Sequence, residues 1–212
     1  MIKLSLWLSI LVIGLSAVMA IYSKQRGQRF IHYAFKPLTM ALVISLAWER
    51  TVSAPSIYGY LILAGLCFSL LGDVFLMLPG NKIKPGLFAF LAAQILYILA
   101  FSRGIKPVHL SSLPFILAYG AAFFLFLYKG LGRMRGPVFV YILVISAMVW
   151  LAISRYQVRH DPGSLLAGIG ALLFLFSDSL NGVKRFRKPF GSAEVLILGT
   201  YFPAQLLFAL SI

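Results

Sequence analysis

The chain has 212 residues, of which 61% are hydrophobic and only 11% charged, and its mean hydropathy is +0.94. Soluble domains carry about 25% charged residues because their surfaces face water, so this composition excludes a soluble globular protein and indicates one embedded in a bilayer. The 19 lysines and arginines outnumber the 5 acids, but they lie between apolar runs and do not cluster on one polar face. This distribution argues against a nucleic-acid partner.

Apolar runs long enough to cross a membrane recur along the whole chain. A hydrocarbon core about 30 Å thick takes roughly 20 apolar residues as a helix. Between breaks made by Pro, Gly and basic clusters, the sequence predicts eight helical spans, at about 4–22, 35–48, 57–78, 86–102, 110–128, 137–154, 163–181 and 192–211. The fold class is therefore all-α, a polytopic bundle in which residues 1–212 form one transmembrane domain with no soluble domain.

The first span also resembles a secretory signal. Lys3 precedes an apolar run that ends in Ala17-Val18-Met19-Ala20, a small-residue pattern typical of a cleavage site. We expect an uncleaved span instead, because the polar segment that follows is short and leads straight into the next span.

The basic residues are divided unequally between the two sides of the predicted bundle. One side carries 13: Lys24, Arg26, Arg29, Lys36, Lys82, Lys84, Lys129, Arg133, Arg135, Lys184, Arg185, Arg187 and Lys188. The other side carries 6: Lys3, Arg50, Arg103, Lys106, Arg155 and Arg159. The positive-inside rule puts the first set in the cytoplasm, so both termini are expected outside.

Two of the five acids lie where an acid is costly. Asp73 is inside the third span and Asp178 inside the seventh, and a carboxylate at a helix centre costs about 2.5–3.5 kcal/mol on insertion scales. Both spans run outward to inward, and both acids precede the cytoplasmic end by about one to two turns. They are therefore expected to share one site facing the cytoplasm. Glu49 and Asp161 fall in outward loops, and Glu194 opens the last span, where a helix N-terminus favours an anion.

Other polar side chains fall at similar depths in neighbouring spans. Gln94 and Tyr97 are three residues apart, and Tyr201 and Gln205 are four apart, so each pair shares a helix face. The candidate substrate-binding residues are Lys36, Gln94, Tyr97, Ser177, Ser179, Tyr201 and Gln205. Taken singly, a Gln or Tyr in a membrane helix is more often a packing contact between helices than a ligand contact.

The two halves of the chain echo each other. Residues 93–97 (AQILY) recur as residues 204–208 (AQLLF), each in the span that follows an acid-bearing span. Four spans separate the two copies, and an even number indicates a parallel repeat of four spans each.

The sequence lacks the motifs of several common kinds of catalytic site. Three histidines, His32, His109 and His160, fall at span ends or in loops, and Cys67 is the single cysteine, so no zinc site, disulfide framework or other cofactor is expected. No nucleophile motif of the G-x-S-x-G type and no phosphate-binding loop is present. The candidate catalytic side chains that remain are two acids, a lysine, amides and phenols, and this set suits acid–base chemistry.

Five segments, in this order, resemble the YhhN family, which includes the lysoplasmalogenases. They are residues 35–39 (FKPLT), 65–73 (ending in LGD), 90–97, 177–179 (SDS) and 201–205. The resemblance runs from Phe35 to Gln205 with the same eight-span layout. One departure is Gln94, where members of the family often carry His, whereas the second acid motif favours the enzymatic branch.

The resemblance implies a hydrolase that splits the vinyl ether bond of a lysophospholipid, a lysoplasmalogen, into a fatty aldehyde and glycerophosphoethanolamine or glycerophosphocholine. That reaction needs a proton donor, an anion near an oxocarbenium ion and a base for water. Asp73 and Asp178, in different protonation states, could supply all three, as paired carboxylates do in glycosidases. Lys36 could bind the substrate phosphate or pair with an Asp. The alternative is a proton-coupled transporter or lipid-translocating protein in which the same acids form a proton relay.

Overall fold

Eight long helices build the structure. The computed structural model describes residues 2–78, 83–105 and 109–212, with side chains from residue 6 onward. The helices are α1 (Ile2–Gln25), α2 (Arg29–Ser53), α3 (Ile57–Met77), α4 (Ile83–Phe101), α5 (Leu113–Leu127), α6 (Arg135–Arg159), α7 (Pro162–Phe186) and α8 (Ala193–Leu210), with two single 3₁₀ turns between α5 and α6, η1 (Tyr128–Gly130) and η2 (Gly132–Met134). Within the described residues, all eight predicted spans correspond to helices apolar and long enough to cross a membrane.

Capping residues set several helix starts. The Asp161 side chain accepts a hydrogen bond from the Ser164 amide at 2.7 Å, and Pro162 occupies the first turn of α7. Asp followed by Pro is a strong signal for the start of a helix. The Asp side chain bonds a backbone N–H of the first turn that has no partner within the helix, and Pro has no N–H that needs one. Ser56 caps α3 in the same way, accepting from the Gly59 amide at 3.0 Å.

The predicted start of the second span was wrong. The span was placed at 35–48, with Lys36 and Pro37 at its beginning, but α2 begins at Arg29 and Pro37 lies inside it. Hydropathy detects only the part of a helix that is apolar, and Arg29 and His32 interrupt the apolar residues in the first turns of α2. The additional residues at the start of α2 place His32 on the helix, one turn before Lys36.

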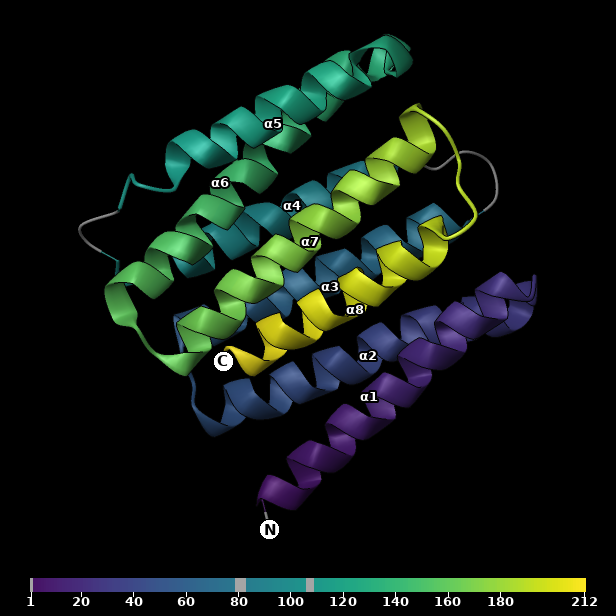
Figure 1. Ribbon diagram of the computed structural model, residues 1–212. Helices are drawn as coiled ribbons and strands as arrows, with labels where there is room; N and C mark the ends of the chain where they lie inside the picture. The colour runs from purple at the N-terminus through teal and green to yellow at the C-terminus, as the bar shows by residue number, and fades with distance from the viewer. Residues whose placement is uncertain (1, 79–82, 106–108) are drawn as a thin grey trace.

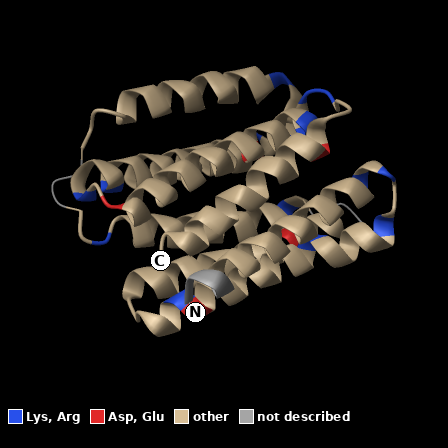
Figure 2. Ribbon diagram, turned by 60° about the horizontal axis from the view of Figure 1, so that its bottom comes forward, with Lys and Arg blue, Asp and Glu red and all other residues tan. Residues whose placement is uncertain are grey.

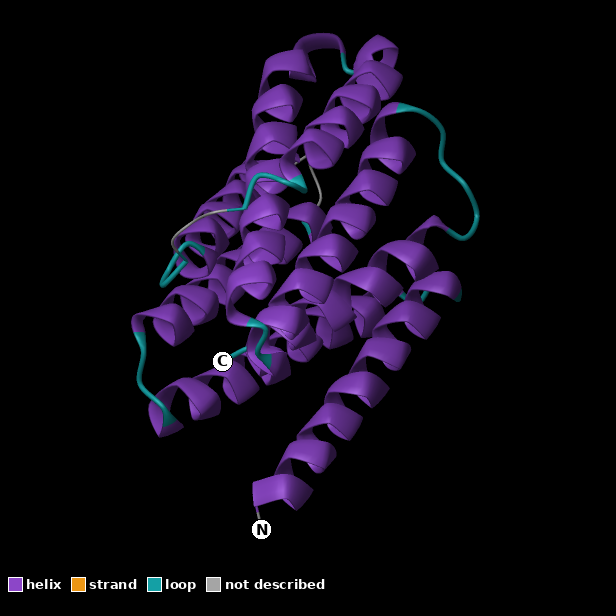
Figure 3. Ribbon diagram, turned by 60° about the vertical axis from the view of Figure 1, so that its left-hand side comes forward, coloured by secondary structure: helices purple, strands orange, loops and turns teal. Residues whose placement is uncertain are grey.

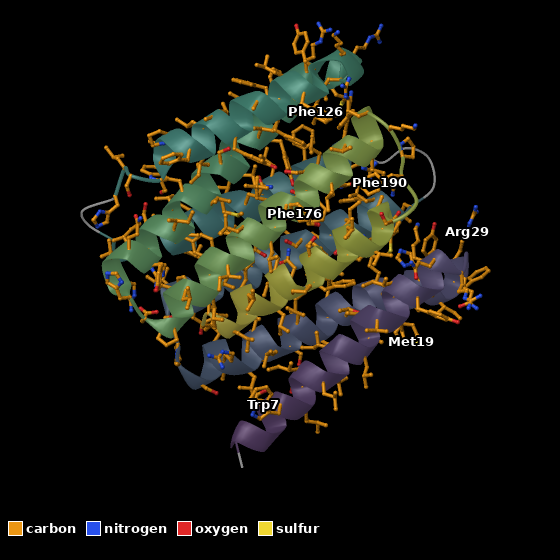
Figure 4. All side chains as sticks on the ribbon, in the orientation of Figure 1. Trp7, Met19, Arg29, Phe126, Phe176 and Phe190 are labelled. Carbon is orange, nitrogen blue, oxygen red and sulfur yellow. The ribbon has the colours of Figure 1, made fainter. Side chains whose placement is uncertain are left out.

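The helices run roughly along one direction, with α1 and α2 at one edge and α5 at the other, while α3 and α4 lie behind α7 and α8 (Figure 1). Figure 3 shows the same bundle from the side, with short connections at its ends. Apolar side chains point away from the bundle all around it, among them Trp7, Met19, Phe126 and Phe176 (Figure 4). Such an apolar exterior is expected of a protein surrounded by lipid.

Helices α3 and α4 pack closely because glycines line their interface. A Cβ atom built on Gly65 would lie 2.3 Å from the ring of Tyr97, and one on Gly72 would lie 2.7 Å from the ring of Phe90. Small residues let membrane helices approach and gain van der Waals contact, which replaces the hydrophobic effect as the packing force there. The approach brings Asp73, the next residue after Gly72, against the interior of the bundle.

Candidate active site

Three helices converge on Asp73. Its side chain is 2% exposed. Lys36 of α2 places its Nζ 2.8 Å from one carboxylate oxygen, and the hydroxyl of Tyr201 of α8 donates to the other at 2.6 Å. The first acid is therefore held as an ion pair with an additional hydrogen bond.

Asp178 has partners of a different kind. Its Oδ2 accepts hydrogen bonds from the hydroxyl of Tyr141 of α6 and from the amide of Gln94 of α4, the latter at 3.5 Å. No lysine or arginine lies within ion-pair distance of this carboxyl among the described residues. Each acid thus accepts from a tyrosine, and the two differ in that Asp73 has a lysine as its second partner and Asp178 an amide.

Both acids line one cavity of ≈ 170 Å³, here called the polar cavity. Charged and titratable side chains surround it: Lys24, His32, Lys36, Asp73, Asp178, Lys184, Arg185 and Glu194. Glu194 forms ion pairs with Lys184 and, at 3.7 Å, with Lys24. His32 is buried and donates from Nδ1 to the carbonyl of Ala20 at 2.9 Å.

A second cavity, of ≈ 80 Å³, adjoins the first and is here called the apolar cavity. It lies among α4, α5, α6 and α7, and most of its lining is Leu, Ile, Val and Phe. Five residues line both cavities: Leu76, Phe90, Asp178, Asn181 and Arg185. Asp178 therefore stands where a polar, basic compartment meets an apolar one.

The remaining predicted site residues fall into two groups. Ser177 lines the polar cavity and donates to the Ile197 carbonyl, while Ser179 lines the apolar cavity and accepts from Tyr119 at 2.8 Å. Tyr97 and Gln205 are fully buried, line neither cavity and bond to each other at 3.0 Å. Gln94 lines neither cavity and reaches the site through its bond to Asp178.

Sequence reasoning missed three contributions to the site. Tyr141 is not among the predicted site residues, because no sequence signal shows which way a tyrosine in an apolar helix faces. Glu194 was placed correctly at the start of the last helix, but its two lysine partners come from α1 and α7. His32 and Arg185 join the cavity because their helices extend beyond the apolar runs.

No group of three or more His, Cys, Asp and Glu side chains is arranged to hold a metal ion in the described part of the chain. The groups that meet at the polar cavity are two carboxyls with lysine, tyrosine and amide partners. These groups can hold, donate and accept protons.

Comparison with known proteins finds a matching family model and relatives over most of the chain. The model of the YhhN family matches residues 31–212. The uncharacterized membrane protein YhhN of Escherichia coli O157:H7 is 30% identical over 98% of this chain and 99% of its own length. Lysoplasmalogenase TMEM86B of Homo sapiens is 31% identical over 97% of this chain and 85% of its own, and lysoplasmalogenase TMEM86A of Bos taurus is 34% identical over 71% and 64%. No solved structure matches the chain.

Proposed function

The chain belongs to the YhhN family, and from this premise we propose that it is an integral membrane hydrolase that cleaves the vinyl ether bond of lysoplasmalogens. The products would be a fatty aldehyde and a glycerophospho-ethanolamine or -choline. The single observation that carries the proposal is the position of Asp178, on the lining of both a polar and an apolar cavity, with Asp73 on the same polar cavity. The relatives named lysoplasmalogenase support the substrate class.

The two cavities match the two parts of a single-chain phospholipid. In this proposal the hydrocarbon chain enters the apolar cavity, and the phosphate lies in the polar cavity near Arg185, which has no carboxylate partner among the described residues. Lys24 and Lys184 share the single carboxylate of Glu194 and add positive charge beside it. The vinyl ether oxygen joins chain and headgroup, so it would lie at the junction, beside Asp178. Lys36 is already paired with Asp73 at 2.8 Å, which favours a role in holding that carboxylate over a role in binding phosphate.

The reaction begins when an acid protonates the outer carbon of the C=C–O unit and leaves an oxocarbenium ion. Water adds to this cation and loses a proton, and the resulting hemiacetal collapses to an aldehyde and an alcohol. No net proton is consumed. The enzyme must therefore supply a proton, an anion close to the cation and a base for the water, as glycosidases do with two carboxyls.

We assign the proton donor to Asp178 and the anion to Asp73. The ammonium of Lys36 lies beside Asp73 and favours its charged form, whereas Asp178 has no cation partner among the described residues. The hydrogen bonds to Asp178 both reach Oδ2, which leaves Oδ1 to carry the proton. Two carboxyls with unlike surroundings can take unlike roles in one reaction.

The deciding experiment offers purified protein two lysophospholipids that differ only in the bond at the first glycerol carbon. A 1-alkenyl and a 1-acyl lysophosphatidylethanolamine of equal chain length are incubated separately, and aldehyde and fatty acid are measured. We expect aldehyde from the alkenyl lipid and no fatty acid from the acyl lipid. Binding of the alkenyl lipid without aldehyde release would reject the hydrolase and favour the alternative of a lipid-translocating protein.

A further inference from the structure

The opposite end of the bundle contains a larger cavity, of ≈ 650 Å³, that the proposed reaction does not use. We call it the arginine cavity, because all of its basic residues are arginines: Arg50, Arg103, Arg155 and Arg159. Asp161 is its acidic side chain, and Tyr58, Ser56, Ser164 and Ser211 contribute hydroxyls. Asp161 and Asp178 are 17 residues apart on one helix, so the arginine cavity lies about 25 Å from the acids.

Both carboxylate oxygens of Asp161 already accept hydrogen bonds from neighbouring groups. One oxygen of Asp161 accepts from Arg159 Nε at 2.6 Å, and the other caps α7 through the Ser164 amide at 2.7 Å. Partial burial alone would raise the pKa of Asp161, but the hydrogen bonds from Arg159 and Ser164 outweigh it and hold the pKa below its usual range. Arg50, Arg103 and Arg155 consequently have no carboxylate partner within the described residues.

Two of these three guanidiniums are held in place by uncharged groups. Arg155 is 7% exposed, donates to the Arg103 carbonyl at 2.6 Å and stacks over the ring of Tyr58 at 4.3 Å. Arg50 donates to the Leu210 carbonyl at 3.2 Å, and its Nε is buried with no partner among the described residues. Burying a cation without an anion is costly, so fixed guanidiniums around an open cavity indicate that an anion completes them.

We propose that the arginine cavity binds a phosphate group, carried either by a lipid headgroup or by free phosphate. Guanidinium groups match phosphate oxygens with two parallel hydrogen bonds, which an ammonium cannot do. The N-terminus of α7 lines the cavity as well, but Asp161 already caps it, so the guanidinium groups carry the proposal. Figure 2 shows that basic residues gather at both ends of the bundle; those of the polar cavity are mostly lysines.

Arg103→Gln is the main test variant. The bond from Arg155 goes to the backbone carbonyl of Arg103, so the substitution removes one charge and leaves that contact in place. Arg133→Gln is the matched control, because it removes an exposed arginine that lines none of the three cavities. Thermal stability is measured for both proteins so that a folding defect is seen directly.

The first arm titrates inorganic phosphate into the detergent-purified protein by calorimetry at constant ionic strength. The second arm uses dihexanoyl-phosphatidylglycerol below its micellar concentration. We expect Arg103→Gln to weaken binding at least about tenfold, and Arg133→Gln to leave it unchanged. Arg155→Lys keeps the charge but loses the paired geometry, and it should also weaken binding.

Each outcome decides the proposal. Saturable, Arg103-dependent binding of inorganic phosphate supports it with free phosphate as ligand, and binding of the lipid alone supports it with a headgroup as ligand. Binding of neither probe overturns it, as does equal binding by the parent and a stably folded Arg103→Gln protein. Because the readout is binding, aldehyde release bears on the proposed function and not on this cavity.

Discussion

At the scale of single residues, the site distinguishes two side chains that are chemically identical. Asp73 has an ammonium and a phenol as partners, and Asp178 has a phenol and an amide. Sequence places both at one depth, but it does not reveal this asymmetry. The partner cation is what makes a division into acid and base chemically reasonable.

The first prediction tests that division. Asp73→Asn and Asp178→Asn should each lower aldehyde release at least about 10²-fold, because an amide neither donates that proton nor carries the charge. Asparagine is nearly the same size, and at Asp178, which has no cation partner among the described residues, the melting temperature should stay level or rise. Asp73→Asn leaves the Lys36 ammonium without its carboxylate and should lower the melting temperature. The double variant should be little worse than either single one if the two acids act as a unit. Asparagine variants that melt like the parent and keep most of the activity would contradict the mechanism.

The second prediction concerns the buried ion pair. Lys36→Met alone leaves the Asp73 carboxylate without its cation and should cost about 3–5 kcal/mol of stability. Lys36→Met combined with Asp73→Asn removes both charges and should recover most of the lost melting temperature while remaining inactive. Thermal unfolding in detergent, measured beside aldehyde release, separates the two effects. Equal melting of Lys36→Met and the parent would mean that the pair contributes little to stability.

At the scale of helices, the two acids are bonded in a matching pattern. Each acid is bonded by the helix that precedes its own, α2 for Asp73 and α6 for Asp178. Each is also bonded by the helix that follows the other acid's helix, α8 for Asp73 and α4 for Asp178. A parallel repeat of four spans would exchange these helices in this way. The repeat itself stays a prediction, to which this arrangement adds support.

The third prediction tests the close packing of α3 on α4. Gly65→Ala would place a methyl group 2.3 Å from Tyr97, whose ring lies among Phe101, Phe174 and Phe208 and cannot move freely. Overpacking of this kind typically costs 1–3 kcal/mol. Gly199→Ala in α8 is the control, because nothing lies within 4 Å of its added methyl and alanine favours a helix. If both variants melt alike, the interface is not tightly packed.

At the scale of the whole molecule, the charge distribution predicts orientation in the membrane. The acids and the polar cavity lie toward the end that carries 13 of the 19 basic residues in the sequence count. Lys82 and Lys106, which enter that count, lie outside the described residues, as does the side chain of Lys3. The orientation with both termini outside remains a prediction, and so does entry of substrate from the cytoplasmic leaflet.

The fourth prediction tests this orientation with reporter fusions. A reporter joined after Ile212 should be active only in its outward-acting form, and one inserted at Arg133, between α5 and α6, only in its cytoplasmic form. The paired insertions control for each other, because a correct eight-span fold requires opposite results. A cytoplasmic signal from the fusion at Ile212 would invert the assignment and move the site to the other leaflet.

The sequence by itself determined the properties that depend on position along the membrane normal. Long apolar runs are visible locally, so the class of protein and the eight spans followed from hydropathy. The depths of Asp73 and Asp178 followed in the same way, because an acid within an apolar run is conspicuous. Hydropathy did not detect the first turns of α2, because Arg29 and His32 interrupt the apolar residues there.

Only the tertiary structure decided which way each helix faces its neighbours. Helices α4, α6 and α8, which carry Tyr97, Tyr141 and Gln205, have no polar stripe that marks the side that turns inward. That is why Tyr141 was missed, and why Tyr97 and Gln205, expected at the site, instead bond to each other away from both cavities. The pairing of Lys36 with Asp73 and the arginine cavity likewise depend on contacts between distant helices, which packing of small and aromatic side chains fixes.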